Sequence, residues 1–151
     1  MSIKTGDTIP LISALNHEGK PVVIDPNNLN APLVIYFYPK DDTPGCTKEA
    51  CSFRDSHEAF TDAGVKVYGI SSDSVESHRK FREKYNLPFD LLTDNKNQIR
   101  KAFGVPTNLL GLLPGRVTYV VDKEGAIRHI FNSQLNAERH VTEALEAIKS
   151  L

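Results

Sequence analysis

The chain has 151 residues, of which 40% are hydrophobic and 25% are charged, and its formal net charge at pH 7 is −1. These values are typical of a soluble globular protein and argue against disorder and fibrous repeats. The small net charge gives no reason to expect nucleic acid or an anionic membrane as a partner. We find no run of about 20 apolar residues that could cross a bilayer and no signal peptide at the start. We therefore expect one complete domain, residues 1–151, in the reducing cytoplasm.

The predicted elements begin with strands. "LISAL" and "PVVID" flank a polar segment that contains a glycine, which predicts an N-terminal β-hairpin. "LVIYFY", residues 33–38, is a continuous apolar run and predicts a strand that is buried on both faces. Residues 46–64 predict a helix that ends at Gly64. We expect further strands at "VKVYGISS", "FDLLTD", "RVTYVVD" and "AIRHIF", and further helices at "VESHRKFREKYN", "NQIRKAF" and "AERHVTEALEAIKSL".

The order of these elements is β-β-β-α-β-α-β-α-β-β-α. Strands and helices alternate in the middle of the chain, which predicts a parallel core for the sheet. The hairpin near the C-terminus adds antiparallel strands. We therefore expect an α/β fold, with a central mixed β-sheet flanked by helices.

Both cysteines lie in "YPKDDTPGCTKEAC", residues 38–51. Cys46 follows a buried strand and a turn rich in proline and glycine, and it begins a helix. The free N–H groups and the positive partial charge of a helix N-terminus favour a thiolate there. On an intact helix the Cα atoms of Cys46 and Cys51 would lie roughly 8–9 Å apart, beyond the ~7 Å that a disulfide usually allows. The pair either stays reduced, distorts the helix, or bonds after a turn unwinds.

The cysteine spacing weighs against other kinds of site. A structural disulfide is disfavoured by the reducing compartment and the short loop that it would close. A zinc site lacks a second cysteine pair and histidines at ligand spacing. What remains is a reactive thiolate with a second thiol that becomes reachable after a conformational change, or a small buried hydrophobe near a helix start.

Three classes of function fit this region. The first is a thiol peroxidase and the second is a general dithiol-disulfide oxidoreductase. The third is a non-enzymatic module that carries a metal such as copper. Four residues separate the cysteines, which speaks against the second class, and Met1 is the single methionine in the chain, which speaks against the third.

Three further features are ambiguous on local sequence. The hydroxyl of Thr43 could bind a helix-start N–H, the thiol or a bound oxygen, or Thr43 could be a turn residue. Arg116 begins a strand, where an arginine is more often a solvated surface residue. The leucines of residues 109–113 could pack on the core. They could also form an apolar rim that favours alkyl hydroperoxides or docks a reductant.

A family resemblance resolves part of this ambiguity. "PKDDTPGC" matches the Pro-x-x-x-Thr-x-x-Cys signature of the peroxiredoxins at Pro39, Thr43 and Cys46. "FYPKDDTPGCTKEACSFRD" and "FGVPTNLLGLLPGRVTYVVDKEG" resemble the bacterioferritin comigratory protein or peroxiredoxin Q subfamily, and the resemblance covers nearly the whole chain. It implies a thioredoxin-like fold and a thiol peroxidase that reduces hydrogen peroxide and organic hydroperoxides.

The resemblance also implies roles for five residues. Cys46 matches the peroxidatic cysteine and Cys51 the resolving one, while Thr43 and Arg116 match the residues that hold thiolate and peroxide, and Pro39 shields the site. It implies a sulfenic acid at Cys46, then an intramolecular disulfide with Cys51 that thioredoxin or a similar dithiol reduces. No metal or organic cofactor is implied. We expect a monomer, because resolution within one chain needs no second subunit.

Overall fold

The computed structural model describes residues 2–108 and 113–151. Its main sheet has seven strands in the order β2-β1-β5-β4-β3-β8-β9. Strands β3, β4 and β5 are parallel, whereas β1 joins β5 and β8 joins β3 in antiparallel fashion. The strands are β1 (Ile12–Asn16), β2 (Pro21–Ile24), β3 (Leu33–Phe37), β4 (Lys66–Ser71), β5 (Asp90–Thr93), β8 (Val117–Val121) and β9 (Ile127–Asn132). The predicted mixed sheet and N-terminal hairpin are therefore confirmed.

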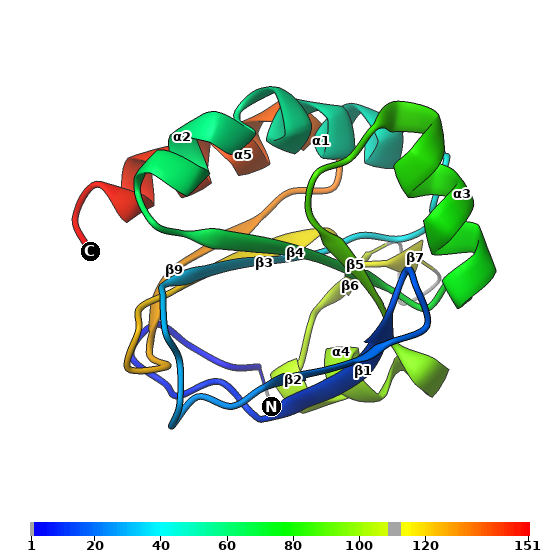
Figure 1. The fold of residues 1–151 in the computed structure, drawn as a ribbon. Helices are drawn as coiled ribbons and strands as arrows, with labels where there is room; N and C mark the ends of the chain where they lie inside the picture. The colour runs from blue at the N-terminus through cyan, green and yellow to red at the C-terminus, as the bar shows by residue number, and fades with distance from the viewer. Residues whose placement is uncertain (1, 109–112) are drawn as a thin grey trace.

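Helices cover both faces of this sheet (Figure 1). Helices α1, α2 and α5 lie above it and α4 lies below it in that view, so the α/β layers expected from the sequence are present. The helices are α1 (Pro44–Asp55), α2 (His57–Asp62), α3 (Val75–Tyr85), α4 (Gln98–Phe103) and α5 (Ala137–Ile148), with a short 3-10 turn at Asn95–Asn97.

Two local features differ from the sequence prediction. The helix expected over residues 46–64 is divided at Ser56, whose φ of −101° and ψ of 7° end α1 and begin α2. Serine competes with the helical backbone for hydrogen bonds, which makes it a weak helix interior residue. A second pair of strands, β6 (Thr107–Asn108) and β7 (Leu113–Pro114), was missed because two residues are too short to show alternation.

The core is divided into two halves by the sheet. Along β3, Val34 and Tyr36 face the half that includes residues of α1 and α5, and Ile35 and Phe37 face the half that includes Phe103 of α4. All five residues of β3 are buried, as the apolar run predicts. Strand β3 is therefore fixed from both sides, and the turn that follows it starts from a rigid base.

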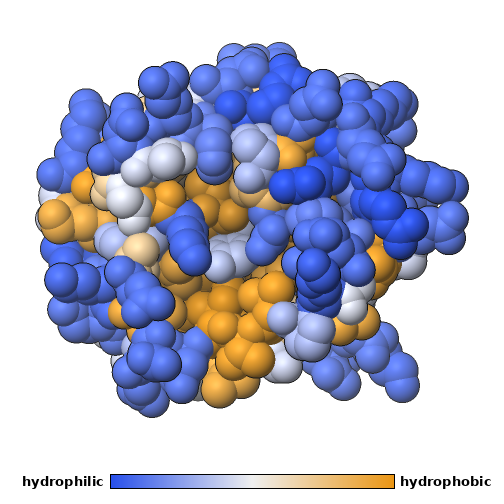
Figure 2. Space-filling view, viewed as in Figure 1, coloured by the Kyte–Doolittle hydropathy of each residue, from blue (hydrophilic) through white to orange (hydrophobic). Residues whose placement is uncertain are grey.

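In Figure 2 the surface over helices α1, α2 and α5 is mostly hydrophilic. Apolar residues gather at the centre and in the lower part of this view. Within the described ranges, no helix is both long enough and apolar enough to cross a membrane. The leucines at 109, 110 and 112 lie outside the described residues, so the prediction about their segment stays open.

Candidate active site

The turn between β3 and α1 carries Cys46. Thr43 is the N-cap of α1, with extended backbone angles, and Pro44 occupies the first helical position, where its missing N–H costs no hydrogen bond. Cys46 follows two residues later, in the first turn, and is 1% exposed. The predicted position of this cysteine at a helix start behind a buried strand is thus confirmed.

Arg116 lies beside this cysteine. Its Nη2 atom donates to Cys46 Sγ at 3.3 Å, and the side chain is buried. A Cβ atom on Gly45 would lie 3.0 Å from the same Nη2 atom, so the glycine makes room for the guanidinium. The local sequence of Arg116 alone suggested a solvated surface residue, but the side chain is buried. It reaches Cys46 because β8, which follows it, pairs with β3, which precedes the cysteine.

Glu49 is a buried acid that binds the other side of the guanidinium. Its Oε1 atom accepts from Arg116 Nη1 at 2.6 Å, and the residue is 0% exposed. Burial raises the pKa of Glu49 from 4.5 to about 8, although Arg116 opposes the shift. Burial lowers the pKa of Arg116, but Glu49 and Cys46 outweigh it, so the net pKa lies above its ordinary value. Sequence reasoning missed Glu49, although it lies three residues from Cys46, on the buried face that also carries Phe53.

The other predicted site residues occupy the same turn and helix. The hydroxyl of Thr43 donates to the Lys40 carbonyl at 2.9 Å, and it does not cap the helix with its side chain. Pro39 is half-buried directly after β3. Cys51 is half-buried in α1, and both cysteines are free thiols. The helix is continuous from Pro44 to Asp55, so a bond between the cysteines requires a change in α1.

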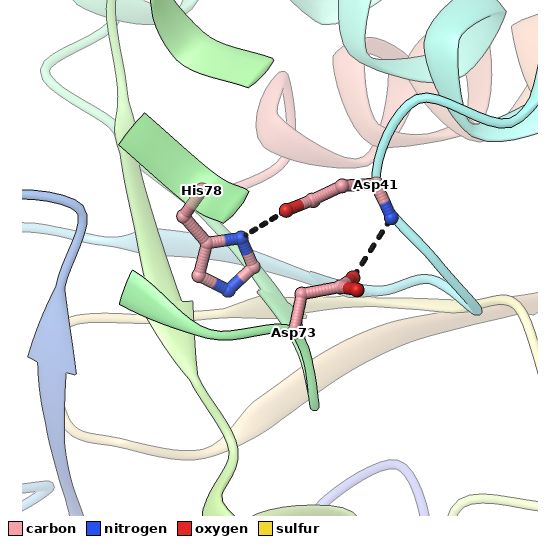
Figure 3. A group of neighbouring side chains, drawn as sticks. All are labelled: Asp41, Asp73 and His78. Atoms are coloured by element: carbon pink, nitrogen blue, oxygen red, sulfur yellow. Dashed lines mark hydrogen bonds and ion pairs between the residues drawn. The ribbon is translucent and has the colours of Figure 1, made fainter. Parts of the chain in front are cut away.

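A buried network fastens the turn to α3 (Figure 3). The Asp41 carboxylate accepts from the Tyr38 hydroxyl at 2.6 Å, the Ser77 hydroxyl at 2.9 Å and His78 Nδ1 at 2.8 Å. The Asp41 backbone N–H donates to Asp73 Oδ2 at 2.8 Å. Although Asp41, Asp73 and His78 are residues that bind metals, the histidine nitrogen is bonded directly to the carboxylate. We therefore assign this cluster as a structural ion pair and not as a metal site.

The next residue of the turn makes a second, exposed connection to α3. Asp42 has a φ of +56°, and its carboxylate accepts from Lys84 Nζ and from the Tyr85 hydroxyl, each at 2.9 Å. These hydrogen bonds lower the pKa of Asp42. Two adjacent aspartates thus fix the turn, one by a buried contact and one at the surface.

Arg100 connects the two segments that lead into the site. Its Nη1 atom donates to the Gly115 carbonyl at 2.8 Å and its Nη2 atom to the Tyr38 carbonyl at 3.2 Å. These carbonyls directly precede Arg116 and Pro39. Burial lowers the pKa of Arg100. The residue was missed because an arginine in a short helix normally faces solvent.

Comparison with known proteins is consistent with this geometry. Residues 5–130 match the AhpC/TSA family. A chloroplastic peroxiredoxin Q from Sedum lineare is 50% identical over 149 residues, which cover 99% of this chain and 80% of that protein. The peroxidoxin BcpB structure from Mycobacterium tuberculosis has a TM-score of 0.89 at 34% identity, with 99% and 98% of the two chains covered. For the Xanthomonas campestris bacterioferritin comigratory protein, the TM-score is 0.84 at 30% identity, with 95% and 98% covered.

The chain is a peroxiredoxin of the AhpC/TSA family. It belongs to the peroxiredoxin Q group, as its sequence resemblance implied, and it is a thiol peroxidase with the thioredoxin-like fold. Peroxides are therefore its substrates.

The predicted cytoplasmic location was wrong. Curated relatives of this peroxiredoxin, among them those from Sedum lineare and Arabidopsis thaliana, are named as chloroplastic proteins. Targeting signals are addresses that receptors read, so a folded domain's composition does not report its compartment.

Proposed function

We propose that this peroxiredoxin reduces hydrogen peroxide and organic hydroperoxides through the Cys46 thiolate, and that Cys51 then resolves the product. The observation that supports this most directly is the position of Cys46 Sγ, in the first turn of α1 and 3.3 Å from Arg116 Nη2. Both neighbours favour the charged sulfur, which is the nucleophile. Organic hydroperoxides are included because alkyl peroxide reduction activity is described for the Xanthomonas campestris bacterioferritin comigratory protein, whose fold this chain shares.

In the first step the Cys46 thiolate attacks the nearer peroxide oxygen. The S–O bond forms as the O–O bond breaks, and negative charge moves onto the departing oxygen. Arg116 and the Cys46 backbone N–H are donors for this charge, and we assign the same role to Thr43, whose hydroxyl would turn away from Lys40. Pro39 shields the reacting sulfur from water. Loss of one such donor, as in Arg116→Met, is expected to lower the peroxide rate by about 10²–10³-fold.

In the second step Cys51 attacks the sulfenic acid of Cys46. The N-terminal turns of α1 unwind, the disulfide forms and water leaves. An external dithiol, for which we propose thioredoxin, then reduces the bond. Because both cysteines belong to one chain, we propose that residues 1–151 act as a monomeric single domain without a metal or organic cofactor.

Thiol counting tests this proposal. The reduced protein has two thiols, and one equivalent of hydrogen peroxide should remove both within seconds. Cys51→Ser should yield a sulfenic acid that dimedone traps at Cys46, and Cys46→Ser should leave its remaining thiol intact. Thiol loss in the wild type no faster than in free cysteine would refute the peroxidase chemistry of this pair.

A further inference from the structure

A chain of buried polar groups begins at Arg116 Nη1 and has no role in the attack on peroxide as described above. From Arg116 Nη1 the chain passes to the Glu49 carboxyl group, whose Oε2 atom lies 3.5 Å from His140 Nδ1 on α5. That nitrogen in turn lies 2.8 Å from the Thr118 hydroxyl on β8. Glu49 and His140 are both fully buried. The chain thus joins α1, α5 and β8 through buried side chains.

The histidine presents an acceptor to this acid. His140 Nε2 lies 2.7 Å from the Ser133 carbonyl, which can only accept, so Nε2 carries a hydrogen. Burial lowers the pKa of His140 to about 4, so the ring is neutral at neutral pH and Nδ1 has a lone pair. The Thr118 hydroxyl donates to that lone pair at 2.8 Å, and Glu49 Oε2 faces the same acceptor at 3.5 Å. A carboxylate oxygen would be repelled there, whereas a protonated Oε2 would share the acceptor with Thr118. Among the described residues, Oε2 has no hydrogen-bond partner.

Arg116 is a single cation between two acids. Its Nη2 atom binds Cys46 Sγ and its Nη1 atom binds Glu49, and all three side chains are buried. Two anions on one guanidinium would leave a net buried negative charge, which is costly. We propose that Cys46 and Glu49 share one proton, that Glu49 holds it at Oε2 toward His140 when Cys46 is the thiolate, and that His140 is the positioning residue for this state.

Arg100 of α4 is a second cation that acts on Cys46, but its guanidinium donates to the Gly115 and Tyr38 carbonyls, whereas Arg116 contacts both Cys46 and Glu49 directly. The remaining groups near Glu49 do not relieve the competition for Arg116. Tyr36 on β3 is neutral, because burial first, and then Glu49 and Cys46, raise its pKa well above the ordinary value. Lys48 on α1 is solvent-exposed and pairs with Glu138 of α5 at 3.1 Å. Burial raises the pKa of Glu49 to about 8, which is consistent with a neutral acid at neutral pH.

The shared proton completes the peroxide step of the proposed function, on which this inference rests. Attack converts the Cys46 thiolate to a neutral sulfenic acid and the hydroperoxide to an alkoxide. Because the sulfur is then neutral, it no longer competes with Glu49 for the positive charge of Arg116. Glu49 therefore ionises. Glu49 releases one proton and the alkoxide takes one up, so that thiolate, acid and hydroperoxide become sulfenic acid, carboxylate and alcohol with charge conserved.

The inference is tested by the titration of Glu49 itself. In reduced protein with ¹³C-labelled glutamate, Glu49→Gln assigns the Glu49 carboxyl signal, which should titrate well above its ordinary 4.5. Cys46→Ser, which removes the competing anion, should move that midpoint down by at least about one pH unit, a tenfold change in proton affinity. A midpoint near 4.5 in the reduced wild type, or one that Cys46→Ser does not move, would overturn the proposal. Since no peroxide is used, this result is separate from a failure of the peroxidase chemistry.

Variants of His140 separate proton positioning from packing. His140→Gln keeps an N–H for Ser133 but loses the Nδ1 acceptor, so the Glu49 midpoint should fall. His140→Asn restores an acceptor near the Nδ1 position and should recover the midpoint. Equal midpoints in the two variants would contradict the role of His140.

The rate profile gives a second readout. At pH values above the Glu49 midpoint, the wild-type rate with hydrogen peroxide should fall by up to about tenfold per pH unit. The Glu49 carboxylate then competes with the Cys46 thiolate for the positive charge of Arg116. In Glu49→Gln this alkaline decline should be absent. Glu138→Gln is the matched control, because it makes the same change in an exposed contact between α1 and α5. A profile for Glu49→Gln that is merely parallel to that of the wild type would refute the shared proton.

Discussion

The buried pair between Asp41 and His78 gives a sharp prediction about the active-site turn. His78 Nε2 lies 3.1 Å from the Leu92 carbonyl and its Nδ1 lies 2.8 Å from Asp41 Oδ2. Both partners accept, so both ring nitrogens are placed to donate, and Nδ1 faces a carboxylate. Asp41→Asn removes the carboxylate that pairs with this fully buried ring.

The expected cost follows from that burial. Removal of one partner from a buried ion pair typically destabilises a protein by about 3–5 kcal/mol, a large part of the roughly 5–15 kcal/mol that holds a domain together. We expect a loss in this range for Asp41→Asn. The chain has no tryptophan, so urea unfolding of the reduced protein should be followed by far-UV circular dichroism.

The neighbouring residue provides the control. Asp42→Asn makes the same chemical change in a pair with Lys84 that is open to solvent, and asparagine tolerates the positive φ at this position. Its effect on unfolding should be within experimental error. Equal losses for Asp41→Asn and Asp42→Asn would refute our interpretation, as would additive effects of Asp41→Asn and His78→Gln in a double-mutant cycle.

Four further outcomes are expected. Gly45→Ala places a Cβ 3.0 Å from Arg116 Nη2, so stopped-flow peroxide rates should fall while the fold, followed by circular dichroism, stays intact. Arg100→Met leaves two buried carbonyls without their donor, so the same rate should fall by about tenfold or more, and thermal unfolding should show a stability loss of about 1–3 kcal/mol for each carbonyl. A carboxyl whose pKa is raised in the folded state stabilises the fold at pH values below its unfolded pKa, and this contribution is lost as the pH rises. The free energy of unfolding of Glu49→Gln, measured by urea titration, should therefore increase relative to that of the wild type from pH 4.5 to about 8. The change should be up to about 1.4 kcal/mol per pH unit. The reverse holds for His140, whose pKa is lowered to about 4, because its contribution is lost as pH falls below 6.5.

The fold was predictable where the signal is local. The continuous apolar run of β3, the hairpin at the N-terminus and the apolar stripe of α5 all formed as expected. The proline and glycine residues before Cys46 likewise predicted a helix start. The division of α1 and α2 at Ser56 was missed, because the apolar spacing of Phe53 and Phe60 continues across the break.

The surroundings of Cys46 were not predictable from local sequence. Arg116 is brought to the cysteine by the pairing of β3 with β8, a contact between residues about 80 positions apart in the register of Tyr36 and Thr118. Glu49, His78 and Arg100 are charged or titratable residues that normally face solvent. Their burial depends on partners in other elements, which periodicity cannot identify.

In the proposed mechanism, Asp41 and Arg116 act on opposite sides of the turn of α1 that unwinds. Asp41 is held to α3 through His78, and its carboxylate binds Tyr38, Ser77 and His78, not Cys46. The contact between Arg116 and Cys46 does depend on it, because a charged sulfur binds a guanidinium more strongly than a neutral sulfenic acid does. Oxidation therefore weakens one of the contacts that hold the first turn of α1, while the turn before it stays fixed. In the mechanism that we propose, the peroxide reaction itself thus favours the unwinding that Cys51 needs, and the thiolate form favours the continuous helix in which peroxide is attacked.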